Sequence, residues 1–183
     1  MNFIILTGGT NKRFGSQKFE AKIGEKTLLE TLCSYLPDGD LIVVGPNTSI
    51  AATYLREEPE LSGPLSAIGA GMQRVESELV GIFATDMPFA PKLLPKLIEN
   101  LKDDAALPLD DEGEVQPLAG IYKSSALKAA LSTYENLANQ SVRSLIEKLR
   151  INPVPLVETG FLIDIDTKEA LTEAIAIKSR LGL

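Results

Sequence analysis

Residues 2–18 read NFIILTGGTNKRFGSQK, the stretch of the chain that is most informative about its architecture. Residues 2–7 are mainly apolar and β-branched, which is typical of a buried strand, and the pair Gly8-Gly9 ends the run. The loop that follows is long and basic. A buried strand that opens into a glycine-rich loop favours an α/β protein in which ligands bind at the carboxyl ends of parallel strands.

The rest of the chain alternates between short apolar runs and segments with helical spacing. This alternation predicts an α/β, Rossmann-like, three-layer αβα sandwich with a mostly parallel sheet, formed by residues 1–183 as a single domain. Residues 110–113 are expected to be a polar turn between paired strands. Further strands are expected at residues 41–44, 79–84, 105–109, 115–122, 154–157 and 161–163. Helices are expected at residues 27–36, 49–55, 65–75, 91–101, 124–134, 141–149 and 168–180.

The composition narrows the possible chemistry. The 183 residues include 18 basic and 25 acidic side chains, and the net charge of −7 argues against broad nucleic-acid binding. The chain has no histidine, which excludes imidazole bases and histidine-ligated zinc, and its single cysteine, Cys33, is expected to be a small buried hydrophobe. No apolar run is long enough to cross a membrane, and no signal-peptide pattern is present. A cytoplasmic protein without membrane association is therefore expected.

The loop at residues 6–18 offers the groups that a phosphate chain needs. Glycine lets backbone amides approach closely, and Arg13 and Lys18 supply positive charge. The spacing differs from that of a Walker loop and from the Gly-x-Gly-x-x-Gly dinucleotide fingerprint. Phosphate binding therefore stands beside a simpler interpretation, an ordinary strand-to-helix loop whose cations face solvent.

Carboxylates follow two of the expected strands. Asp86 comes directly after one of them, where a hard oxygen ligand suits Mg²⁺. Asp164 and Asp166 alternate with apolar residues, so in an extended strand both would point to one face, where two like charges favour a cation or a substrate contact. The alternatives are structural: Asp86 would start a turn before Pro88, and Asp166 or Thr167 would cap the last helix.

These motifs together resemble a known family. The spacing from Leu6 to Lys18 is similar to the first-loop signature Leu-x-Gly-Gly-x-Ser-x-Arg-Met/Phe-Gly-x-x-Lys of MobA-like nucleotidyltransferases, with Asn11 in place of the usual serine. Asp86-Met87-Pro88-Phe89 resembles the second motif of that family, and Asp164-Ile165-Asp166-Thr167 resembles a later one, in which Lys168 replaces a proline. The resemblance covers most of the chain and implies the nucleotidyltransferase version of the α/β fold.

The resemblance implies an enzyme that depends on Mg²⁺, transfers GMP from GTP to molybdopterin and releases pyrophosphate. It also implies transient contacts with other proteins that handle the molybdenum cofactor. One alternative is the use of CTP or another nucleotide, with molybdopterin or a different phosphate acceptor. The other alternative is a noncatalytic protein that binds nucleotides without releasing pyrophosphate.

Roles for individual residues follow from the same resemblance. A group that offers backbone amides, cations and carboxylates would hold the nucleotide. Its members are Leu6, Thr7, Gly8, Gly9, Arg13, Lys18, Glu58, Gly63 and Asp86. Of these, Arg13, Lys18 and Asp86 would also take part in catalysis, the two cations by stabilising the leaving pyrophosphate. Asp164 and Asp166 are the further candidates for holding the metal with Asp86.

Glu58 and Gly63 stand where the family has Arg-Glu-Asp-Pro and Gly-Pro-Leu motifs. A carboxylate at the position of Glu58, where the family usually has aspartate, would accept two hydrogen bonds from guanine. On the acceptor side the implied residues are Gln116, Gly120 and Arg143. Three of these residues also have simpler structural interpretations: Glu58 as an exposed turn residue, Gly120 as part of a bulge and Arg143 as a solvent-facing side chain.

Overall fold

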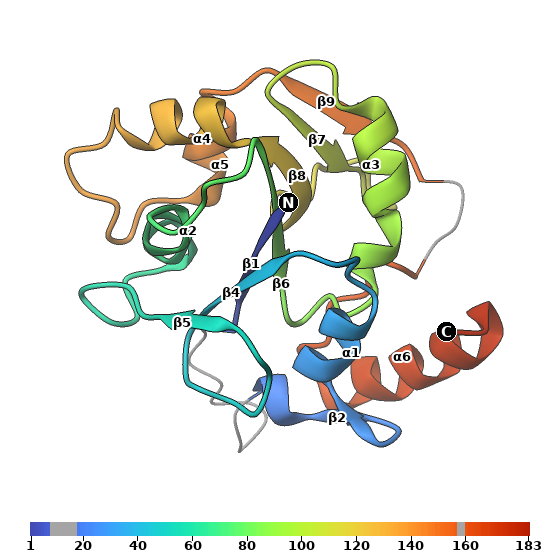
Figure 1. Ribbon diagram of the computed structural model, residues 1–183. Helices are drawn as coiled ribbons and strands as arrows, with labels where there is room; N and C mark the ends of the chain where they lie inside the picture. The colour runs from blue at the N-terminus through green and yellow to red at the C-terminus, as the bar shows by residue number, and fades with distance from the viewer. Residues whose placement is uncertain (8–17, 157–159) are drawn as a thin grey trace.

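A seven-stranded β-sheet runs through the centre of the molecule (Figure 1), whose computed structural model describes residues 1–7, 18–156 and 160–183. Its strands are β1 (Asn2–Leu6), β4 (Asp40–Val44), β5 (Thr53–Leu55), β6 (Leu79–Ala84), β7 (Ala105–Pro108), β8 (Ala119–Lys123) and β9 (Ile151–Val154). They lie in the order β5-β4-β1-β6-β8-β7-β9. Within the described residues, β8 is antiparallel to both neighbours and the other pairs are parallel. The expected mostly parallel sheet is confirmed.

Helices cover both faces of the sheet, which confirms the expected three layers (Figure 1). On one face lie α2 (Pro64–Met72), α4 (Ser124–Leu131) and α5 (Val142–Ile146). On the other face lie α1 (Leu28–Ser34) and α3 (Leu94–Asn100). Both faces are therefore closed to water, as a largely parallel sheet requires.

The last helix, α6 (Lys168–Leu181), packs beside α1 and a small hairpin of β2 (Lys22–Ile23) and β3 (Lys26–Thr27). This hairpin was not predicted, although Gly24, whose φ is +69°, marks its turn. None of the helices in the described parts of the chain combines the length and the apolar character needed to span a membrane.

The first strand is buried because apolar side chains point to both faces. Phe3 and Ile5 pack in the cluster that includes α1 and α3, whereas Ile4 and Leu6 pack in the cluster that includes α2. Full burial of each such side chain contributes about 1.5–3 kcal/mol to stability. A continuous apolar run of this kind is the pattern by which the central strands could be predicted.

Most of the expected helices are confirmed with shorter ends. Thr27 caps α1, since its hydroxyl accepts the Glu30 amide at 3.1 Å while the Glu30 carboxylate accepts the Thr27 amide at 2.8 Å. The helix expected at residues 91–101 begins as a 3₁₀ turn, η2 (Ala90–Leu93), and continues as α3. Another 3₁₀ turn, η1 (Lys18–Glu20), leads into the hairpin.

The prediction of a helix at residues 49–55 is wrong. Residues 53–55 form β5, which pairs in parallel with β4 at the edge of the sheet. The Tyr54 hydroxyl donates to the Ile50 carbonyl at 2.8 Å and so ties the preceding turn to the strand. So short a segment does not define a period, and its aromatic and β-branched residues favour a strand once β4 is beside them.

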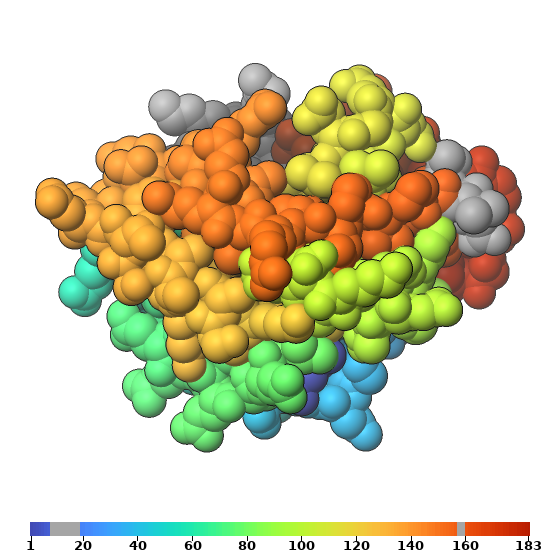
Figure 2. All heavy atoms as spheres, turned by 90° about the horizontal axis from the view of Figure 1, so that it is seen from above, coloured from blue at the N-terminus to red at the C-terminus, as the bar shows by residue number. Residues whose placement is uncertain are grey.

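Two strands expected near the carboxyl terminus are also wrong. The strand expected at residues 154–157 lies earlier, as β9, which forms an edge of the sheet and is exposed at the molecular surface (Figure 2, orange). Pro153 lies within it, and an edge strand tolerates the missing amide of proline. Residues 161–163 form a turn instead of a strand.

The strand expected at residues 115–122 is interrupted. Val115 forms an isolated bridge with Leu109, and a turn in which the Ala119 amide donates to the Gln116 carbonyl at 3.2 Å precedes β8. The predicted pairing across the polar turn is confirmed, because β7 and β8 are antiparallel neighbours.

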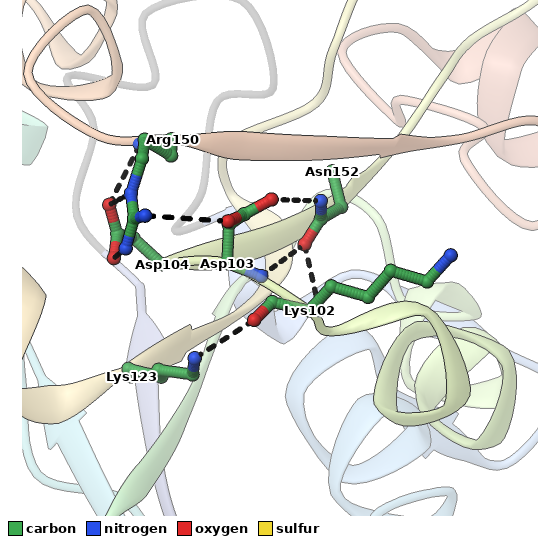
Figure 3. A network of polar contacts seen from close by, with 6 residues as sticks. All are labelled: Lys102, Asp103, Asp104, Lys123, Arg150 and Asn152. Carbon is green, nitrogen blue, oxygen red and sulfur yellow. Dashed lines mark hydrogen bonds and ion pairs between the residues drawn. The ribbon is translucent and has the colours of Figure 1, made fainter.

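At the amino-terminal edge of the sheet, an ion pair joins β7 to β9 (Figure 3). Arg150 comes directly before β9 and Asp104 directly before β7, and parallel neighbours begin at the same edge. Asp104 accepts the Arg150 amide, Nε and Nη2 at 2.9, 3.1 and 3.0 Å. These hydrogen bonds from Arg150 lower the pKa of the Asp104 carboxyl to about 2.

Asn152 and Lys123 extend this network. Asn152 Oδ1 accepts the backbone amides of Lys102 and Asp103 at 2.8 and 2.7 Å, and Lys123 Nζ donates to the Lys102 carbonyl at 3.1 Å (Figure 3). Backbone polar groups beside the starts of β7 and β9 are thus hydrogen-bonded. They lie at the edge of the sheet opposite to the carboxyl ends of the parallel strands.

Candidate active site

The carboxyl ends of β1, β4 and β6 meet at one edge of the sheet, and hydrogen bonds beyond the strands fix how the chain leaves them. The amide and the hydroxyl of Thr7 each donate to the Val44 carbonyl at 3.2 Å. The amide and the hydroxyl of Thr85 donate to the Leu6 carbonyl at 3.1 and 3.2 Å. Both threonines are buried. The first loop and Asp86 therefore begin side by side.

Gly45 follows β4 at the point where the chain passes closest to Thr7. Its amide donates to the Leu55 carbonyl at 2.9 Å, its φ is +149°, and a Cβ at this position would overlap the Thr7 hydroxyl. Glycine is therefore required here by close approach. Sequence reasoning missed both Gly45 and Thr85. The sequence feature that could have identified them is that each comes directly after an apolar strand.

Asp86, Asp164 and Asp166 come together at this edge. One carboxylate oxygen from each lies within 4.8 Å of the other two; Asp86 is half-buried and the others are exposed. The Ile165 amide donates to the Asp86 carbonyl at 2.9 Å, and the Ile165 side chain is fully buried. The later two aspartates are therefore held on either side of an anchored residue, in a loop and not in the extended strand that their alternation predicts.

The cap of α6 is Thr167, whose hydroxyl accepts the Ala170 amide at 3.1 Å. Capping therefore does not account for Asp166. The three carboxylates supply only oxygen donors, the type of ligand that Mg²⁺ and similar hard cations prefer. Because the donors also lie within reach of one another, this group fits a divalent cation.

Residues 56–63 connect β5 to α2 at the same edge of the sheet. Glu58 is exposed in this loop, and Arg56 forms an ion pair with Glu60 at 2.9 Å. Gly63, whose φ is +98°, is the residue from which α2 begins. The structure thus places Glu58 in an exposed turn, and its contact with a base, like that of Gly63 with a nucleotide, remains a prediction.

The expected acceptor residues lie in three different settings. Gln116 Nε2 donates to Asp110 Oδ2 at 2.7 Å and so helps to hold the turn after β7. Gly120 is buried in β8, where a Cβ would overlap the Leu107 side chain, so packing favours a glycine here even without a bound acceptor. Arg143 is exposed on α5 and lines a groove of about 370 Å³. Contact with an acceptor remains a prediction for all three.

The first loop is described only at its ends. Leu6 closes β1 and Thr7 follows it. Gly8, Gly9 and Arg13 lie outside the described residues. The backbone of Lys18 belongs to η1, but its side chain is not among those described. The roles predicted for these residues therefore remain predictions.

Two further titratable groups are inert by burial. Cys33 is half-buried, and its side chain packs against the core beside α1, where a small buried hydrophobe was predicted. Its partial burial raises the pKa of the thiol to about 11, which keeps it protonated at neutral pH. The Tyr122 hydroxyl donates to the Pro117 carbonyl at 2.6 Å, and burial raises the pKa of this phenol too. Neither group is suited to acid–base chemistry.

Solved structures share this architecture. Molybdopterin-guanine dinucleotide biosynthesis protein A from Archaeoglobus fulgidus superposes with a TM-score of 0.76 at 21% identity, over 98% of this chain and all of the other. A nucleotidyl transferase from Methanothermobacter thermautotroptrophicus superposes with a TM-score of 0.77 at 14% identity, over 98% of both chains. At these identities the likeness supports the fold.

Sequence comparison gives the family. A probable molybdenum cofactor guanylyltransferase from Bacillus cytotoxicus is 26% identical over 97% of both chains. One from Carboxydothermus hydrogenoformans is 32% identical over 66% of this chain, a match that spans 64% of that relative's length. The model of the MobA-like NTP transferase domain matches residues 3–154, which is most of the chain. The protein therefore belongs to the MobA-like NTP transferase family of nucleotidyltransferases.

Proposed function

We propose that the protein transfers GMP from GTP to the terminal phosphate of molybdopterin and releases pyrophosphate. The observation that carries the proposal is the meeting of Asp86, Asp164 and Asp166 beside the end of β1, where the phosphate-binding type of loop begins. Relatives named molybdenum cofactor guanylyltransferase support the same reaction.

The reaction is an in-line displacement at the α-phosphorus of GTP. An oxygen of the acceptor phosphate forms a bond to this phosphorus, while the bond to the oxygen that bridges the α- and β-phosphates breaks and pyrophosphate leaves with that electron pair. The attacking phosphate is ionised at neutral pH, so no side chain has to remove a proton. Catalysis then depends on positioning and charge neutralisation, which suits a chain without histidine.

Charge neutralisation is assigned to two groups of side chains. Asp86, together with Asp164 and Asp166, would hold Mg²⁺, which when bound neutralises phosphate charge. Arg13 and Lys18 are proposed to bind the triphosphate and to stabilise the charge that develops on the leaving pyrophosphate. Removal of either cation is expected to lower the rate more than the stability.

Substrate recognition is assigned to the neighbouring loops. The backbone from Leu6 onward is proposed to hold the base and phosphates, and the loop of Glu58 and Gly63 to select guanine. Gln116, Gly120 and Arg143 are proposed for the acceptor. Transfer of a labile cofactor also favours transient contacts with other proteins that handle it.

The test is pyrophosphate release with Mg²⁺ and GTP, CTP, ATP or UTP, each with and without molybdopterin. Release is expected with GTP and molybdopterin together. Asp86→Asn keeps the shape of the side chain but removes its charge, so it is expected to lower turnover by about 100-fold or more. Asp38→Asn makes the same charge change on an exposed turn and is expected to leave turnover unchanged.

Other outcomes reassign the protein. Release with CTP in place of GTP would make it a cytidylyltransferase and remove the selective role of Glu58. Nucleotide binding without release, with every acceptor supplied, would favour a noncatalytic nucleotide-binding protein. Full turnover by Asp86→Asn would exclude the proposed carboxylate site.

A further inference from the structure

The loop that carries Glu58 and Gly63 contacts a second loop, residues 136–140, which is part of the connection between α4 and α5. The backbone amide of Asn139 donates a hydrogen bond to the Ser62 carbonyl at 2.7 Å. The Cα of Asn139 lies 4.0 Å from the position that a Cβ on Gly63 would take, so the two backbones are in contact. Both loops lie beside α2 in Figure 1.

Ser62 is the buried end of the first of these loops. Its residue exposure is 4%, and its hydroxyl has no hydrogen-bond partner among the described residues. Two other bonds, from Arg56 to Glu60 and from the Leu61 amide to Glu57, stay within the loop. At the end of the loop, the Gly63 carbonyl accepts the Ala67 amide of α2 at 3.2 Å. The bond from Asn139 additionally ties Ser62 to a separate loop.

The second loop is itself held independently of Ser62. A Cβ on Gly69 of α2 would overlap the end of the Leu137 side chain, so Leu137 lies directly against this helix. Asn136 Oδ1 accepts the Ala138 amide at 2.8 Å and fixes the start of the loop. The loop of Asn139 therefore has contacts of its own, with α2 and within itself, besides its bond to Ser62.

Asn139 is suited to this place by its backbone. Its φ is +59°, in the left-handed region, and among the described non-glycine residues Leu61 is the other one with a positive φ. Asparagine adopts this conformation more readily than most residues, whereas a β-branched residue strongly disfavours it. The Asn139 side chain is exposed, so packing does not explain its identity.

We propose that Asn139 is a positioning residue for nucleotide selection. Its left-handed backbone points the Asn139 amide at the Ser62 carbonyl. This hydrogen bond holds the loop of Glu58 in the conformation in which the loop distinguishes guanine from other bases. The proposal rests on the proposed function, in which this loop contacts the base. It assigns base selectivity to a residue on a separate loop that does not itself contact the nucleotide.

The test compares dissociation constants for GTP and ATP, measured with Mg²⁺ on the full chain by calorimetry. Asn139→Val is expected to weaken GTP binding about tenfold and to lower the ATP-to-GTP ratio of dissociation constants about fivefold. Asn139→Gly keeps the left-handed backbone and the amide and is expected to match the natural protein within about twofold. Gln140→Val is the matched control, a β-branched replacement at the exposed neighbour, and is expected to leave the ratio unchanged.

The ratio separates positioning from stability. If Asn139→Val lowers the melting temperature but keeps the ratio, the role is structural and the inference is overturned while the proposed function stands. If the natural protein itself does not distinguish GTP from ATP, the proposed guanine selectivity fails first. Should Asn139→Val not fold, Asn139→Ala, which is less strained in the left-handed region, replaces it, and an unchanged ratio there overturns the inference equally.

Discussion

At the scale of single residues, the candidate site depends on Gly45, because a side chain at this position would overlap Thr7. Gly45 leaves room for the Thr7 hydroxyl, which donates to the Val44 carbonyl at 3.2 Å and so directs the chain into the first loop. The contact is between backbone and a short buried side chain, so a Cβ at this position could be accommodated only if Thr7 shifted. The geometry of the loop's first residue is therefore set from β4.

Gly45→Ala is expected to raise the KM for the nucleotide about tenfold, because its Cβ must displace Thr7 at the start of the loop that is proposed to bind phosphate. Steady-state kinetics measures the change. Gly24→Ala is the control: Gly24 also has a positive φ, +69°, but a Cβ there meets nothing within 4 Å. Equal KM values for the two variants would contradict the proposed link between Gly45 and the loop.

At the scale of elements, the sheet is fastened at the edge away from the site. The pair of Asp104 and Arg150 joins the starts of β7 and β9, and β9 pairs with β7 alone within the described residues. Three charge-assisted hydrogen bonds in one pair are stronger than a typical surface ion pair. This pair is therefore expected to support the edge strand more than the site.

Asp104→Asn is expected to lower the melting temperature at pH 7 by about 2–4 °C, the equivalent of about 1 kcal/mol, with little effect on turnover. Because folding lowers the pKa of Asp104 from about 4 to about 2, its contribution is fully present above pH 5 and disappears as the pH falls toward 2. Urea unfolding between pH 7 and pH 3 measures this. Asp38→Asn, on an exposed turn, serves as the charge-matched control, and an equal loss in both variants at every pH would count against the pair.

At the scale of the whole molecule, three negative charges are concentrated at the candidate site. A chain of net charge −7 brings three carboxylates within 4.8 Å of one another, from the end of β6 and from the segment before α6. Like charges at this distance oppose folding unless other charges compensate for them. A cation that binds there would stabilise the native fold and would join two distant parts of the chain.

Mg²⁺ at ten times its dissociation constant is expected to stabilise the protein by about 1.4 kcal/mol and to raise its melting temperature by about 3–6 °C. The comparison is with NaCl of equal ionic strength, which screens charge without occupying the site. The double variant Asp164→Asn/Asp166→Asn is expected to lose most of the increment. Identical melting curves of the natural protein in the two salts would argue against a metal site in the free protein.

The sequence by itself determined the elements whose signals are local. Residues 79–84 are a continuous apolar run, and they form the buried strand from which Asp86 emerges. The alternation of such runs with helical segments was enough to predict the three-layer sandwich. A strand that is covered on both faces must be apolar throughout. Residues 49–55 were too short to carry a period, so β5 was missed.

The family resemblance implied that Asp164 and Asp166 lie beside Asp86, but only the tertiary structure shows by which contacts distant residues meet. Asp164 lies 78 positions after Asp86, and the contact depends on the Ile165 amide reaching the Asp86 carbonyl, a backbone bond that no side-chain pattern encodes. The same is true of Asn139 and Ser62, and of Gly45 and Thr7. Local propensity acts within a few residues, whereas the site is assembled by strand order and by hydrogen bonds between loops, which exist only after the sheet has formed.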